Sequence, residues 1–220
     1  MNALGPYLPL VVLGLLPFVL LATTSFMKLS IVLSMLRNAL GVGQVPSALV
    51  ITVLAAVLTG YVMLPVLRAV TLAAGPHAAQ VDWNAPLSPA SRPALERAFW
   101  QGLEPLRVFW DKHSGRSERE LFVELKRRAL PESDRDDVGE SDVSVVLPAF
   151  FVTELSEAFQ IAFLLLLPFL VIDLVVTSLL VSLGMQALPP TLVSLPLKLL
   201  LFLSVDGFRT LIEALLAGYA

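Results

Sequence analysis

The chain has 220 residues, of which 56% are hydrophobic and only 15% are charged, and its mean hydropathy is +0.80. This composition departs from that of an average soluble domain and indicates a membrane protein. The sequence contains no cysteine, which excludes disulfide frameworks, thiol nucleophiles and thiolate metal sites. The two histidines, His77 and His113, are too far apart for a metal site on one helix, and no block of Lys and Arg indicates a nucleic-acid partner. We therefore expect no cofactor, no metal and no nucleic acid.

Four apolar stretches are long enough to cross about 30 Å of hydrocarbon, which takes roughly 20 helical residues. They cover residues 7–27, 47–67, 159–183 and 189–216. The first pair predicts an N-terminal membrane hairpin within residues 1–74, and the last pair predicts a C-terminal hairpin within residues 148–220. Each stretch contains or adjoins a proline, and because proline removes a backbone donor we expect the helices to bend or break at Pro17, Pro65, Pro168 and Pro196.

A polar region separates the two hairpins at residues 75–147 and holds most of the chain's 15 basic and 18 acidic side chains. It must lie outside the bilayer. Helical spacing predicts one apolar helix face there, and an S-x-x-E capping box at Ser117 and Glu120 predicts the start of a second helix. The residues of the face are Leu95, Phe99, Leu103, Leu106 and Trp110. Residues 131–142 carry six acids and one base, which is typical of a mobile solvated loop.

Basic residues in short connections predict the orientation of the chain in the membrane. The connection after the first apolar stretch holds Lys28 and Arg37 and no acid, so we expect it to face the cytoplasm. Residues 75–147 then lie on the extracytoplasmic side, as a small helical region.

Two opposite charges interrupt the C-terminal apolar stretches. The turn at residues 183–190 contains a glycine and two prolines, and its tip lies at Met185 and Gln186. Asp173 lies 12 residues before Met185, and Lys198 lies 12 residues after Gln186. In an antiparallel hairpin both side chains would sit about 18 Å from the tip, at the same depth. An ion pair at 4 Å would contribute about 4 kcal/mol, comparable to the cost of placing one charge in the bilayer. The alternatives are that Asp173 faces water and that the Lys198 side chain extends to the membrane surface.

Other charged groups near the apolar stretches have simpler interpretations. Asp206 is a third acid close to the end of the last stretch. Glu154, Glu157 and Gln160 recur at helical spacing before the third stretch, and we expect them to form its water-facing side.

Three segments of the chain carry a family resemblance: "TSFMKLSIVLSMLRNALG" at 24–41, the long run from "LPAFFVTELSEAFQ" to "SLLVSLGM" at 147–185, and "LPPTLVSLPLKLLLFLSVDGF" at 188–208. They resemble the FliP/SctR family, the R component of the type III secretion export apparatus. The resemblance implies a multi-pass protein of the bacterial inner membrane, assembled partly on the periplasmic side. It implies bent hairpins that stack in a ring or helix, five copies in known members, together with the S and T components.

The resemblance also implies the partners and the function. The assembly would form the entry pore for unfolded export substrates, beside the export gate and the inner rod or needle proteins. Family members carry a methionine-rich loop that acts as a gasket around the pore, and this loop corresponds to Met185, Gln186, Ala187 and Leu188, of which only Met185 is methionine here. The family's paired aspartate and lysine correspond to Asp173 and Lys198. Flagellar members usually carry a cleaved leader, and since the chain has no charged residue before Lys28 we favour an injectisome with a role in virulence.

Two other functions compete with the export pore. An ion- or proton-coupled transporter would also use broken helices and buried charges at mid-depth, although transporters usually show internal repeats and none is convincing here. An intramembrane di-aspartyl protease would use Asp173 and Asp206. Such enzymes place the second aspartate in a G-x-G-D setting, whereas Asp206 follows Leu203, Ser204 and Val205, so we expect no enzyme.

Overall fold

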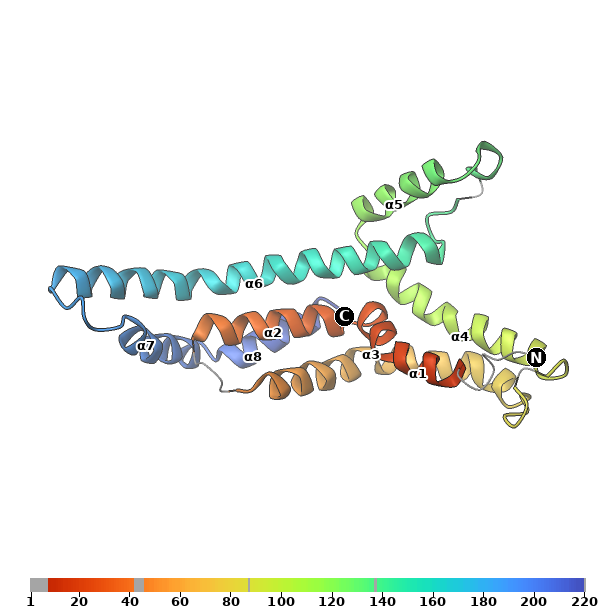
Figure 1. The fold of residues 1–220 in the computed structure, drawn as a ribbon, viewed down its shortest axis with the longest axis horizontal. Helices are drawn as coiled ribbons and strands as arrows, with labels where there is room; N and C mark the ends of the chain where they lie inside the picture. The colour runs from red at the N-terminus through yellow and green to blue at the C-terminus, as the bar shows by residue number, and fades with distance from the viewer. Residues whose placement is uncertain (1–7, 42–45, 87, 137, 220) are drawn as a thin grey trace. The chain divides into compact units, whose positions relative to one another are not determined.

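The computed structural model describes residues 8–41, 46–86, 88–136 and 138–219, and within these residues the chain is all-α, as the sequence predicts. Figure 1 shows the succession of helices along the chain. The helices are α1 (Leu8–Thr23), α2 (Phe26–Leu40), α3 (Ala48–Ala78), α4 (Arg92–His113), α5 (Arg116–Ala129), the 3₁₀ turn η1 (Glu132–Asp134), α6 (Val143–Ser182), α7 (Thr191–Ser204) and α8 (Gly207–Ala217).

The chain divides into two compact units. The first unit comprises residues 1–25 and 63–154, and therefore contains α1, α4 and α5. The second unit comprises residues 26–62 and 155–220, and contains α2, α7 and α8. Helices α3 and α6 each contribute one part to each unit. Neither unit is continuous in sequence, so each depends on contacts between distant segments.

In the part of the chain that the structure describes, two helices, α3 and α6, are long and apolar enough to cross a membrane, and the broken pair formed by residues 17–23 and α2 would be a third if it is one span. Thr23 and Thr24 end α1 with hydroxyl groups that donate to the carbonyl groups of Val19 and Leu20 at 2.7 and 2.6 Å. Leu20 is one of the last four residues of α1, whose carbonyl groups have no intrahelical N–H donor, so the Thr24 hydroxyl supplies one.

The expectation of one spanning helix over residues 189–216 is wrong. Helix α7 ends at Ser204 and α8 begins at Gly207, with Asp206 between them in the left-handed conformation at φ 49°. A β-carbon on Gly207 would lie 2.3 Å from two ring carbons of Phe202, so the chain turns this corner where only glycine fits. The apolar composition of the stretch concealed this corner.

The four prolines do not end helices, so the chain does not break at these positions, and a bend at each of them stays a prediction. Pro17, Pro65 and Pro196 lie inside α1, α3 and α7, and Pro168 lies within the range of α6. A proline removes one backbone donor, and the hydrogen bonds on either side carry the helix past it. The chain leaves the helical conformation instead at residues 24–25 and 205–206.

In the first unit, the ends of three helices meet around Trp110. The Trp110 side chain is only 1% exposed, and its indole N–H donates to the carbonyl oxygen of Thr23 at 2.9 Å. Its neighbour Phe109 packs edge-on against Phe150 of α6, with ring centroids 5.6 Å apart. Helix α4 also packs closely on α3, since a β-carbon on Gly102 would lie 3.2 Å from the side chain of Ala74.

The two helices expected in the polar region are α4 and α5, but two details differ. Of the predicted apolar face, Trp110 is buried whereas Phe99 is 60% exposed. The capping box is wrong, because α5 starts after Gly115, whose N–H donates to the Thr153 hydroxyl at 2.8 Å. Glu120 pairs with Arg116 instead, at 2.8 Å.

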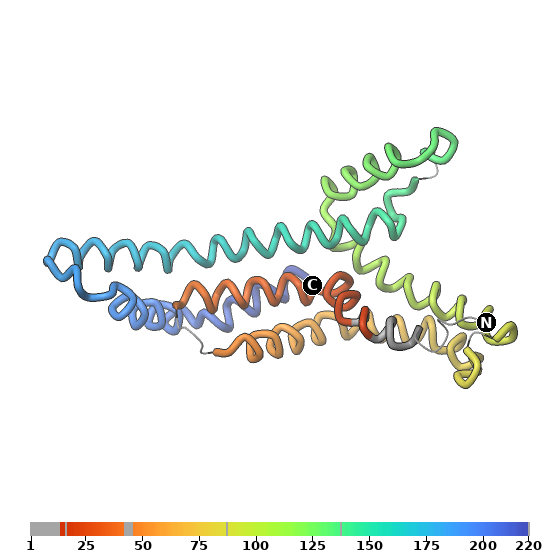
Figure 2. Tube along the Cα trace, in the orientation of Figure 1, coloured from red at the N-terminus to blue at the C-terminus, as the bar shows by residue number. Residues whose placement is uncertain are grey.

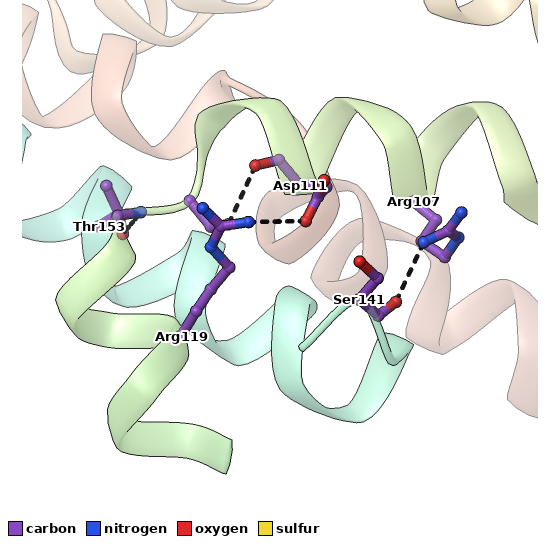
Figure 3. Close-up of polar contacts among 7 residues, drawn as sticks. Arg107, Asp111, Arg119, Ser141 and Thr153 are labelled. Atoms are coloured by element: carbon purple, nitrogen blue, oxygen red, sulfur yellow. Dashed lines mark hydrogen bonds and ion pairs between the residues drawn. The ribbon is translucent and has the colours of Figure 1, made fainter. Parts of the chain in front are cut away.

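Polar contacts join α4, α5 and the start of α6 (Figure 3). Arg119 of α5 reaches Asp111 of α4 at 2.9 Å, and Arg107 donates to the backbone carbonyl of Ser141 at 3.2 Å. The acidic segment 131–142 has an apolar anchor as well, because Val138 is buried with Val123 and Val145. The segment is thus packed against α5 and α6 there, rather than solvated throughout as the sequence predicted.

The second unit has one apolar core, to which α2, α3, α6, α7 and α8 all contribute. In Figures 1 and 2, α2, α7 and α8 lie beside the C-terminal part of α6. The buried residues of this core are Leu29, Val32, Leu33, Leu36, Ala39, Leu40, Ile51, Ala55, Leu58, Ala158, Phe169, Phe202, Leu211 and Leu215. This core holds the C-terminal hairpin and the charged residues within it.

Candidate functional site at the C-terminal hairpin

The tip of the α6–α7 hairpin is built by a glycine-terminated helix end. Gly184 has φ +72°, its N–H donates to the carbonyl of Val181 at 3.1 Å, and the Met185 N–H donates to the carbonyl of Leu180 at 2.9 Å. These two bonds are those of a Schellman motif, which satisfies the last carbonyl groups of a helix. The chain then turns back into α7 (Figure 2).

The four residues that correspond to the family's gasket loop lie at this tip. The Leu188 N–H donates to the Met185 carbonyl at 3.2 Å, so the four residues form one tight turn. Met185 is 47% exposed, Gln186 and Ala187 are exposed, and Leu188 is half-buried. Within the second unit, the turn therefore presents a thioether, an amide and a methyl group outward.

Below the tip, the structure brings Asp173 of α6 and Lys198 of α7 together. The Lys198 ammonium contacts the Asp173 carboxylate at 2.6 Å, and its side chain is only 8% exposed. The same ammonium donates to the carbonyl oxygen of Ala39 at 3.1 Å, in the last turn of α2. The carbonyl end of a helix carries a partial negative charge, so a cation is favoured there.

Lys198 thus joins three helices, and the end of α2 is shaped to receive it. Gly41 follows α2 with φ +70°, and its N–H donates to the Asn38 carbonyl at 3.1 Å. A β-carbon on Gly41 would lie 4.0 Å from the Lys198 nitrogen. Sequence analysis predicted the contact with Asp173 but missed the one with Ala39, because the spacing of one hairpin says nothing about a residue 159 positions earlier.

A second ion pair, which the sequence analysis missed, joins α2 to α6 near the other end of α2. Lys28, whose side chain is 5% exposed, contacts the Glu157 carboxylate at 2.6 Å, and its ammonium lies 4.4 Å from the centre of the Tyr219 ring. The predicted water-facing side is right for Glu157, whose side chain is about half exposed, and wrong for Glu154, which is only 1% exposed. The available signal was Lys28 itself, a basic residue within an apolar helix face.

The remaining acid, Asp206, does not join this cluster. It is exposed and precedes α8, and its carboxylate makes no capping bond to that helix. Asp173 is paired with Lys198, so these contacts give no support to a dyad of Asp173 and Asp206. Within the described ranges, no group of three or more His, Cys, Asp or Glu residues could hold a metal ion.

The fold and the site define a helical membrane protein whose notable features are an exposed hairpin tip and two ion pairs that hold the helices behind it. The model of the FliP family matches residues 9–215. The chain belongs to the FliP family.

Three relatives illustrate the similarity. The chain is 39% identical to "Yop proteins translocation protein R" of Yersinia pestis over 208 residues, which cover 94% of this chain and 92% of that protein. It is 38% identical to "Hypersensitivity response secretion protein HrcR" of Ralstonia nicotianae over 214 residues, covering 95% and 94%. It is 38% identical to "Flagellar biosynthetic protein FliP" of Caulobacter vibrioides over 210 residues, covering 94% and 73%. These names describe translocation, secretion and flagellar biosynthesis rather than a catalysed reaction.

Proposed function

We propose that this chain is a structural subunit of the type III secretion export apparatus, and that several copies form the inner-membrane entry pore for unfolded export substrates. Family membership supports the apparatus, since the chain matches secretion proteins along nearly its whole length. The observation that supports the pore is the hairpin tip, which leaves Met185, Gln186 and Ala187 exposed at the end of a braced pair of helices.

In this proposal the turn 183–190 faces the conduit, and the four residues Met185 to Leu188 form a gasket. A seal needs flexible apolar side chains that close on one another and give way to a passing chain, and the unbranched thioether of Met185 suits this role. Leu188 adds a second apolar group, whereas Gln186 makes the ring wetter than one built from methionines alone. Met185 is therefore the main element of the seal.

The partners and the placement follow from the same proposal. The copies form a homo-oligomer, five in the family, that assembles with the S and T components and contacts the export gate and the inner rod or needle proteins. Residues 75–147 lie on the periplasmic side, where part of the assembly is expected. Relatives named for translocation, the hypersensitivity response and virulence support an injectisome rather than a flagellum.

Ion conductance of the assembled complex in a planar bilayer tests the gasket. Met185→Ala is expected to raise the resting conductance, because the main apolar group of the seal is lost. Leu203→Ala is the matched control: Leu203 is also an exposed apolar residue, at 71%, but it lies at the far end of α7. Equal conductance for wild type and Met185→Ala would count against a gasket. Transport of a small solute by the purified chain alone would instead favour an ion- or proton-coupled transporter.

A further inference from the structure

We propose that Gly184 is the positioning residue of the gasket, because its left-handed backbone directs Met185 away from the axis of α6. This inference rests on the proposed function of the tip. It assigns a separate role to a residue that contributes no side chain to the seal.

The backbone of the tip carries the argument. Gly184 ends α6 in the left-handed conformation, at φ +72°. The N–H group of Gly184 then donates to the Val181 carbonyl, and that of Met185 donates to the Leu180 carbonyl. Because both bonds close on α6, the α-carbon of Met185 is fixed relative to that helix. An L-residue pays a steric cost in this conformation, whereas glycine adopts it freely and asparagine visits it more readily than other residues.

The surroundings of Gly184 show that the requirement concerns the backbone and not space. A β-carbon on Gly184 would meet no heavy atom within 4 Å. Size alone would therefore allow alanine. Gly207 is the opposite case, since its β-carbon would contact Phe202 although its φ is not in the left-handed region.

The chain supplies a matched control. Gly60, inside α3, also has nothing within 4 Å of a β-carbon, and its φ is not left-handed. Gly60→Ala and Gly184→Ala add the same methyl group to open space. They differ in the backbone conformation that the methyl group must tolerate.

The experiment measures the position of residue 185 and the conductance separately in the assembled complex. Because the sequence has no cysteine, Met185→Cys can be labelled with a nitroxide at a single site per copy, and distances between copies can be measured by pulsed electron paramagnetic resonance. Gly184→Ala is expected to reduce the population of the native distance by about tenfold, the factor that corresponds to the left-handed cost of an L-residue. Gly184→Asn is expected to retain most of that population, and Gly60→Ala all of it.

Each outcome decides between the two proposals. If Gly184→Ala keeps the native distance distribution, or if Gly184→Asn is as damaging as Gly184→Ala, the positioning role is overturned. Failure of Gly184→Ala to assemble, with normal assembly of Gly184→Asn, supports it, because only the backbone preference distinguishes the two. A shifted distance in Gly184→Ala together with unchanged conductance in Met185→Ala would retain the positioning role and refute the gasket. Raised conductance of Gly184→Ala in the unlabelled chain supports both the positioning role of Gly184 and the gasket.

Discussion

Lys198 lies between two acceptors of different kinds, the carboxylate of Asp173 at 2.6 Å and the backbone carbonyl of Ala39 at 3.1 Å. One contact closes the C-terminal hairpin, and the other attaches that hairpin to the carbonyl end of α2. The Lys198 side chain is nearly buried whereas that of Asp173 is partly exposed. The ammonium therefore depends on these two acceptors to replace hydrogen bonds to water.

Exchange of the two charges is therefore expected to restore only part of the lost stability. Asp173→Asn should lower the free energy of unfolding by about 1.5–3 kcal/mol, the usual contribution of a hydrogen bond to a charged group. The double variant Asp173→Lys, Lys198→Asp should be more stable than either single variant. It should remain less stable than wild type, because a carboxylate at position 198 would face the Ala39 carbonyl oxygen. Thermal unfolding in detergent measures this order. A double variant no better than the single variants would contradict direct pairing.

The Lys28–Glu157 pair should contribute less than the Lys198 contacts, since Glu157 is about half exposed. Glu157→Gln is expected to cost about 0.2–1 kcal/mol in the free energy of unfolding. Glu213→Gln is the control, because Glu213 and Arg209 form an ion pair at 2.8 Å in which both side chains are mostly exposed. Denaturant titration of both variants makes the comparison, and a larger loss in Glu213→Gln would mean that the burial of Lys28 has no energetic role.

Acidification should weaken the packing of the acidic segment against α5. The Lys126 ammonium, at 2.8 Å, holds the pKa of the Asp142 carboxyl below its usual range, against the opposing effect of partial burial. A carboxyl with a lowered folded pKa stabilises the fold above its ordinary pKa, near 4, and that contribution is lost as the pH falls through the folded value. The protection of residues 138–146 from hydrogen exchange in the full chain, relative to the intrinsic exchange rate at each pH, should therefore fall below about pH 4.

Lys126→Met should reduce this pH dependence, because the cation that lowers the pKa of Asp142 most is gone and only the Gly139 N–H still lowers it. Glu140→Gln, at an exposed acid of the same segment, is the control and should leave the dependence unchanged. If Lys126→Met lost as much protection from hydrogen exchange at low pH as wild type, the pH dependence would have to come from a group other than Asp142.

The corner between α7 and α8 gives a steric prediction. Gly207→Ala should lower the free energy of unfolding by about 1–3 kcal/mol, the usual cost of overpacking, because the added methyl group would overlap the Phe202 ring. Gly60→Ala should instead be neutral or stabilising by about 0.4–1 kcal/mol, since alanine restricts the unfolded chain and fits the helix. Thermal unfolding of the two variants checks this. Equal stability would show that the corner relaxes at no cost.

Relations within one hairpin could be predicted from the sequence. The contact between Asp173 and Lys198 follows from equal distances to a turn that Gly184 and two prolines mark, because antiparallel helices place such residues at equal depth. The all-α class and the helices of the polar region could also be predicted from the sequence, since composition and helical spacing are local properties. The chain's apolar stretches likewise indicated α3 and α6.

Contacts between elements far apart in sequence could not be predicted in this way. Nothing near Lys28 specifies Glu157, 129 residues later, and nothing near Lys198 specifies the carbonyl of Ala39. The break at Asp206 was missed because apolar composition does not record that Gly207 must approach Phe202. The capping box failed for a similar reason: Gly115 binds Thr153, a residue of another helix, and thereby sets where α5 starts.

The bond from the Trp110 indole to the Thr23 carbonyl has a consequence for biogenesis. The last turn of α1 receives its donor from a side chain 87 residues further along the chain, so that end stays incomplete until α4 has been synthesised and brought to it. Until then the Thr23 carbonyl group lacks this hydrogen-bond donor. A nascent chain stalled before residue 110 should accordingly be more sensitive to proteolysis near Thr23 than one released after it.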